Sequence, residues 1–141
     1  MASTTTLHRQ YDQNTGRMVA EGRMENGTRQ GCWIHWYPTG ECRALGVYDD
    51  DVEVGLWSYW YKNGQKAAEG VYAQGKEEGE WRYWYENGVL KAEGTYNSGQ
   101  ITGRWNRRTV EDSIQCAEQW EGGKLVRRLR PVPRALQLAT A

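Results

Sequence analysis

The sequence of 141 residues contains no phenylalanine, only three prolines, three cysteines and two histidines. An odd cysteine count at this low density does not suit a disulfide scaffold and favours a reducing compartment. No apolar run approaches the roughly 20 residues of a membrane span, and the first ten residues lack the apolar core of a signal peptide. We therefore expect a soluble, cytoplasmic protein with no integral membrane association.

Net charge is also lacking, because 18 Lys and Arg balance 18 Asp and Glu. Nothing overall indicates binding to nucleic acid or to a membrane surface. The balance is uneven along the chain, however, since residues 124–141 carry five basic residues and no acidic one. The five are Lys124, Arg127, Arg128, Arg130 and Arg134. The part before residue 124 is consequently net acidic.

The chain is instead rich in glycine, tryptophan and tyrosine, with 17, 8 and 9 copies. These residues recur at a step of 24 positions, the signature of a repeat architecture. The positions in phase are Gly22, Gly46, Gly70 and Gly94; Gly31, Gly55, Gly79 and Gly103; Trp33, Trp57, Trp81 and Trp105; Trp36, Trp60 and Trp84; Tyr37, Tyr61 and Tyr85; Tyr48, Tyr72 and Tyr96; and Ala20, Ala44, Ala68 and Ala92.

Each unit reads as a β-hairpin, because stretches such as WRYWY and VLKAEGTY are rich in strand-forming residues and are bounded by turn residues. Pro38 and Gly40 favour a type I turn followed by a left-handed glycine bulge. That turn places Trp84 opposite Leu90 and predicts Arg82 opposite Ala92. Alternation then assigns two faces. The predicted interior holds Trp84, Leu90, Ala92, Gly94 and Tyr96, and the predicted open face holds Trp81, Tyr83 and Tyr85.

One hairpin buries too little surface to fold alone, so the units must stack in series with capped ends. We predict an all-β protein, an elongated twisted antiparallel sheet of tandem 24-residue hairpins. The predicted bounds are a flexible N-terminus at 1–10, a repeat domain at 11–123 and a basic tail at 124–141, disordered or docking. The repeat domain comprises a half repeat, three full repeats and a degenerate cap with one inserted residue before Cys116. Its edge strands are free to pair with another chain.

The segment YENGVLKAEGTYNSGQITGRW, residues 85–105, resembles a MORN repeat, in particular the variant of bacterial antitoxin-like proteins. Residues 92–96 take the place of the usual Y-x-G-x-W, and residues 79–81 that of G-x-G. The resemblance covers residues 11–123. It implies a twisted β array that acts as a scaffold in protein–protein contacts and in some members dimerises through its terminal repeats.

Signals for catalysis are weak, since the histidines are only His8 and His35 and His35 occupies a slot filled elsewhere by tyrosine. Cys32, His35 and Cys42 lack a fourth zinc ligand. The run Asp49 to Asp51 lacks the spacing of a calcium loop. We expect no enzyme activity, no metal and no cofactor.

Tyrosine, tryptophan and arginine concentrate binding energy at interfaces, so the predicted open face is the candidate contact with another protein. Its residues are Trp33, Tyr37, Trp57, Tyr59, Tyr61, Trp81, Tyr83 and Tyr85. The predicted function is a non-catalytic interaction scaffold, with an antitoxin or immunity-type inhibitor as one form of it. The alternative is an aromatic cage for a ligand or glycan, similar to choline-binding repeats. The tail, with Arg127, Arg128, Arg130 and Arg134, is either a docking peptide or a solvated terminus.

Overall fold

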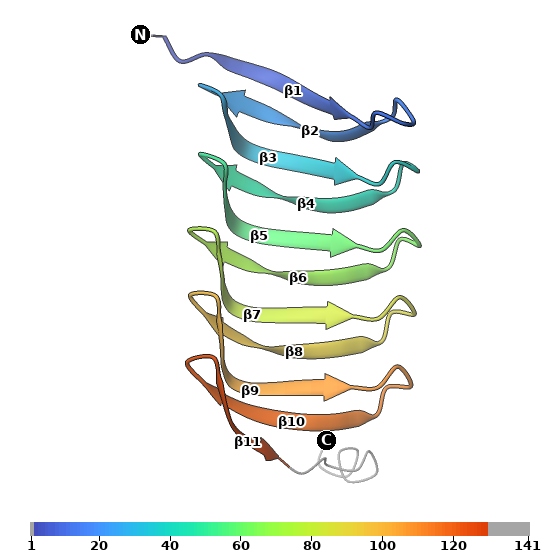
Figure 1. Cartoon of the computed structure of the whole chain (residues 1–141), viewed down its shortest axis with the longest axis vertical. Helices are drawn as coiled ribbons and strands as arrows, with labels where there is room; N and C mark the ends of the chain where they lie inside the picture. Colours follow the sequence, from blue (N-terminus) through green and yellow to red (C-terminus); the bar gives the residue numbers. More distant parts are fainter. Residues whose placement is uncertain (1, 130–141) are drawn as a thin grey trace.

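The computed structural model describes residues 2–129, which form a single antiparallel sheet of eleven strands (Figure 1). The strands follow one another in the sheet in chain order, so each pairs with the next. Their bounds are β1 Thr5–Tyr11, β2 Met18–Glu25, β3 Thr28–Trp36, β4 Cys42–Asp49, β5 Val52–Trp60, β6 Lys66–Ala73, β7 Lys76–Trp84, β8 Leu90–Asn97, β9 Gln100–Arg108, β10 Ile114–Glu121 and β11 Lys124–Leu129. The predicted fold class is confirmed. Residues 2–129 include no helix that is long and apolar enough to cross a membrane.

The predicted hairpin turn is present in each full repeat. In the third, the Tyr85 N–H donates to the Val89 carbonyl at 2.8 Å, and the Gly88 N–H donates to the Tyr85 carbonyl at 2.9 Å. Gly88 has a φ of +87°, the left-handed conformation expected of the bulge. The same two bonds join Tyr37 to Glu41 and Gly40, and Tyr61 to Gln65 and Gly64.

The array is longer than predicted at both ends. Residues 5–11, expected to lie mostly in a flexible terminus, form β1 and pair with β2. Residues 124–129, expected to belong to the tail, form β11 and pair with β10. The remaining predicted tail, with Arg130 and Arg134, lies outside the described residues.

The predicted insertion in the last repeat is wrong. The Asp112 N–H donates to the Thr109 carbonyl at 3.0 Å, the bond that Gly88 makes one repeat earlier. Asp112 has a φ of +65°, and aspartate adopts this conformation more readily than most residues other than glycine. Cys116 then pairs with Arg107 as Ala92 pairs with Tyr83, so the step of 24 residues continues unchanged.

The predicted register fails one residue beyond the turn. Trp84 lies opposite Leu90 as expected, but the register shifts there and Ala92 lies opposite Tyr83 instead of Arg82. Lys91 is therefore a β-bulge, with no partner of its own on β7. Because side chains alternate between faces, one extra residue moves every later position of β8 to the other face.

The two predicted faces are consequently wrong in composition. Trp81 and Tyr83 share a face with Ala92, Gly94 and Tyr96, and this aromatic face holds the core of the protein. Trp33, Trp57 and Trp81, predicted to lie open, are each only 2% exposed.

Tryptophan and glycine alternate across neighbouring strands of the aromatic face. Each indole lies over the glycine of the preceding strand, so that a Cβ placed on Gly70 would come within 2.1 Å of the Trp81 ring. The Trp81 Nε1–H donates to the Val71 carbonyl at 3.1 Å. Trp33, Trp57 and Trp105 make the same bond to the residue after Gly22, Gly46 and Gly94, at 3.0 to 3.1 Å. We call these four indoles the tryptophan row.

A second set of glycines bends every odd strand from β3 to β9 (Figure 1). Gly79 has a φ of +69°. Trp81 pairs with Gly70 while Glu78 pairs with Val71, so Gly79 and Glu80 have no partner on β6. The two unpaired residues allow β7 to turn sharply, and the same bend recurs once in each repeat.

Candidate functional site: the tyrosine pairs of the aromatic face

Above the tryptophan row, each full repeat presents one pair of polar aromatic groups. The hydroxyls of Tyr59 and Tyr72 lie 3.2 Å apart, and those of Tyr83 and Tyr96 lie 3.1 Å apart. In the first full repeat a Tyr hydroxyl faces the imidazole of His35 at 3.4 Å. All four paired tyrosines are partly exposed. The aromatic face therefore carries a regular series of hydroxyl groups, which we call the tyrosine pairs.

Ring packing holds these side chains in place. Tyr59 stacks on Trp57 and Tyr83 on Trp81, each with centroids 6.0 Å apart and planes within 24° of parallel. The edge of Tyr72 meets Trp81 at 5.0 Å between centroids. Such contacts stabilise aromatic pairs by about 0.5–1.5 kcal/mol beyond their burial. The exposed hydroxyls thus project from side chains that have little freedom left to lose on binding a partner.

Burial also fixes the protonation of the tyrosine pairs. It raises the pKa of Tyr59 and Tyr83 well above the ordinary value of 10, and the hydrogen bonds to Tyr72 and Tyr96 raise the pKa further. Burial lowers the pKa of His35 below 6.5, with a smaller contribution from nearby Arg43. At neutral pH the face therefore offers neutral hydroxyl and imidazole groups as donors and acceptors.

The aromatic face has two shallow hollows at its N-terminal half. The first, of about 300 Å³, is lined by His8, Gln10, Met24, Arg29, Trp33, His35 and Asp51. The second, of about 180 Å³, is lined by His35, Arg43, Ala44, Tyr48, Glu53, Trp57 and Tyr59. Neither exceeds the lower end of the range typical of small-molecule pockets, about 300–1,000 Å³. Shallow, polar-rimmed relief of this kind suits a macromolecular surface.

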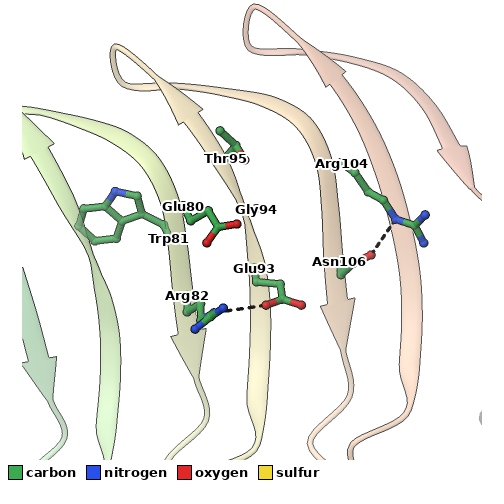
Figure 2. Close-up of a pocket in the computed structure, with 8 residues that line it drawn as sticks. All are labelled: Glu80, Trp81, Arg82, Glu93, Gly94, Thr95, Arg104 and Asn106. Atoms are coloured by element: carbon green, nitrogen blue, oxygen red, sulfur yellow. Dashed lines mark hydrogen bonds and ion pairs between the residues drawn. The ribbon is translucent and has the colours of Figure 1, made fainter. Parts of the chain in front are cut away.

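The opposite face of the sheet holds a charged depression of about 220 Å³ over β7, β8 and β9 (Figure 2). Arg82 and Glu93 form an ion pair at 3.5 Å across its floor, and Arg104 donates to Asn106 at 3.2 Å. The lining includes Glu80 and Thr95 but no histidine or cysteine. These groups are largely matched to one another, so the depression does not assemble a nucleophile with a base.

The predicted contact residues fall into three groups. Trp33, Trp57 and Trp81 lie in the buried tryptophan row, while Tyr59 and Tyr83 belong to the tyrosine pairs. Tyr37, Tyr61 and Tyr85 stand at the hairpin ends, where their hydroxyls donate to carbonyls of the next repeat, on Trp60, Trp84 and Arg108, at 2.6 to 2.8 Å. The last three therefore join consecutive hairpins. Partner binding by any of the eight stays a prediction.

Sequence reasoning missed Tyr72 and Tyr96 as surface groups, because the predicted register placed Tyr96 and its equivalents in the interior. The recurrence of tyrosine at two positions per repeat was visible in the sequence. Only the bulge at Lys91 shows that these positions share a face.

The acidic run at residues 49–51 forms a turn between β4 and β5. The Asp51 carboxylate accepts from Arg29 Nε at 2.8 Å, and Asp50 accepts from Thr28 and Gln30 at 3.1 and 2.7 Å. Each carboxylate thus serves the neighbouring turn. Within residues 2–129, no three His, Cys, Asp or Glu side chains come together in a way that could hold a metal ion.

Comparison with known families gives one finding. Residues 53–74 and 77–98 match the family model described as MORN repeat variant. The two matched segments are the β5–β6 and β7–β8 hairpins, so the resemblance read from the sequence holds for two adjacent repeats. MORN repeats are non-enzymatic and are generally associated with interactions with proteins or membrane lipids. No curated protein matches the chain.

Proposed function

We propose that this chain is a non-catalytic scaffold that binds another protein through the tyrosine pairs of its aromatic face. The observation that carries the proposal is the combination of partly exposed tyrosines with a fully buried tryptophan row beneath them. Tyrosine supplies both apolar area and a hydrogen-bonding group at small entropic cost, and it is enriched at binding hot spots. The repeats matched to the MORN variant are consistent with an interaction role.

A protein partner is favoured over an aromatic cage for a cation or glycan. A cage needs ring faces that are free to surround the ligand. Here the Tyr48 ring is covered by the Arg29 guanidinium at 4.0 Å and packs edge-on against Trp57 at 4.9 Å between centroids. The rings nearest to the hollows are thus already in contact with one another or with arginine.

An inhibitor of the antitoxin or immunity type is one form that such a scaffold takes, and we retain it as the more specific proposal. A basic docking segment is the second element of the proposal. Arg127 and Arg128 lie exposed on β11, where they are available to an acidic partner surface. Cytoplasmic location remains part of this proposal, in line with the three free cysteines.

The test is affinity capture from the native cell extract, followed by reconstitution with the purified partner. The variant Tyr59→Gln/Tyr83→Gln changes the tyrosine pairs to a residue that the fold already accepts, because Gln10 occupies the same register position on β1. Arg82→Gln, on the opposite face of β7, is the matched control. We expect the double variant to weaken binding by about 2 kcal/mol or more, the level of an interface hot spot, and the control to bind normally.

A second comparison separates the docking segment from the face. The chain should be truncated after Leu129, because truncation after Gly123 would remove β11 itself. Loss of binding on truncation would assign the contact to residues 130–141 and contradict the role of the tyrosine pairs. A purified partner that binds the double variant as tightly as the native chain would do the same.

A further inference from the structure

The N-terminal edge of the sheet is an unprotected strand. β1 has no neighbour on its outer side among the described residues, and all seven of its residues are exposed. Leu7 and Tyr11 are 62% and 57% exposed. Free edges are usually blocked by lysine, proline or unpaired charge. β1 contains no lysine or proline, and its Arg9 is paired with Glu21 at 2.7 Å.

The edge at the other end of the array is different. β11 carries Lys124, Arg127 and Arg128 and no acidic residue. Positive charges in this density repel a second β11, and they also disfavour pairing with β1, whose own formal charge is positive. β1 and β11 lie at opposite ends of the array (Figure 1). The charges thus disfavour head-to-tail growth and leave β1 as the edge suited to a second copy.

The aromatic face is also incomplete at β1. The tryptophan row ends at Trp33, and the next side chain is His8, with centroids 6.1 Å apart. Gln10 lies opposite Ala20, as Tyr83 lies opposite Ala92, and Met24 stands one repeat before Tyr48. Smaller groups at these positions leave the hollow of about 300 Å³ at the end of the row.

We propose that two copies of this chain pair through antiparallel β1 strands, about a twofold axis perpendicular to the sheet. This symmetry places both aromatic faces on the same side of one continuous sheet. The His8 and Gln10 side chains of each copy then lie beside those of the other, and they close the hollow that each copy leaves open. The inference is independent of the proposed function, because it involves none of the tyrosine pairs.

The experiment is sedimentation equilibrium of the full chain over a range of concentrations, combined with hydrogen exchange. We expect a species of twice the mass of one chain, and protection of the β1 amides that rises with concentration. Leu7→Lys should weaken dimerisation about tenfold or more, because it adds a charge at the interface in both copies. Leu125→Lys on β11, at a residue that is also exposed, is the matched control and should dimerise normally.

Three results would overturn the proposal. These are a single-chain mass at every concentration, a dimer that Leu7→Lys does not weaken, and a mass that grows beyond two chains as head-to-tail pairing requires. The exposed Leu7 makes no contact with the core clusters, so the variant should keep the near-ultraviolet circular dichroism of the tryptophan row. The concentration dependence of β1 exchange in the native chain tests the same interface without any substitution.

Discussion

Gly70→Ala should destabilise the protein strongly although it adds a single methyl group. The new Cβ would lie 2.1 Å from Cδ2 of Trp81, whereas carbon atoms prefer a separation of about 3.5–4.0 Å. The indole would have to move by about 1.5 Å, away from the Val71 carbonyl that accepts its Nε1–H at 3.1 Å. Overpacking costs roughly 1–3 kcal/mol, and an unmade buried hydrogen bond roughly 1–3 kcal/mol. We expect a loss of about 2–6 kcal/mol.

A double-mutant cycle with Trp81→Leu identifies the cause. Leucine leaves room for the methyl group, so Gly70→Ala should cost little in that background and should even stabilise by about 0.4–1 kcal/mol through the unfolded chain. Urea denaturation followed by circular dichroism gives the four free energies of unfolding. Effects that add to within about 0.5 kcal/mol would show that no steric coupling exists and would refute the alternation of glycine and tryptophan as the basis of the core.

Three other predictions concern protonation and the C-terminal cap. Stability should fall as the pH drops below about 6.5, because the lowered pKa of His35 lets the unfolded chain take up a proton first, and His35→Tyr should flatten this part of a denaturation-against-pH curve. Tyr59→Phe and Tyr83→Phe should leave the number of tyrosines that ionise near pH 10 unchanged in an absorbance titration of the folded chain, because both hydroxyls have raised pKa values. Glu118→Ala should selectively increase hydrogen exchange in β11, because the buried carboxylate accepts from Trp120 Nε1 at 3.0 Å and forms an ion pair with β11 at 3.7 Å. Unchanged β11 exchange in that variant would contradict the assigned cap.

Spacing in the sequence was enough to predict the repeat, the hairpins and their turns. These features depend on local chemistry, such as a left-handed glycine at Gly88, and on a step of 24 residues that needs no tertiary information. The cap of the last repeat was less visible, because Asp112 makes the turn without glycine and Glu118 stands where the earlier repeats have glycine.

The exposed face could not be predicted in the same way. A bulge at Lys91 reverses the alternation of side chains on the rest of β8, and lysine itself carries no signal for a bulge. The tryptophans were consequently predicted to be open when they form the core. The buried indole needs a glycine beside it, and Gly70 and Gly94 were in phase with Trp81 all along. Packing of large against small across adjacent strands was the usable signal.

Every junction between repeats uses the same contacts, such as the hydroxyl of Tyr61 on Trp84 and that of Tyr85 on Arg108. No repeat relies on a distant one, because each strand pairs only with its immediate neighbours. Removing or duplicating a block of 24 residues should therefore leave both caps and all remaining junctions intact. Two strand spacings amount to about 10 Å. The reach of the protein can thus be adjusted like the links of a chain, in increments of about 10 Å that each add one hydroxyl pair.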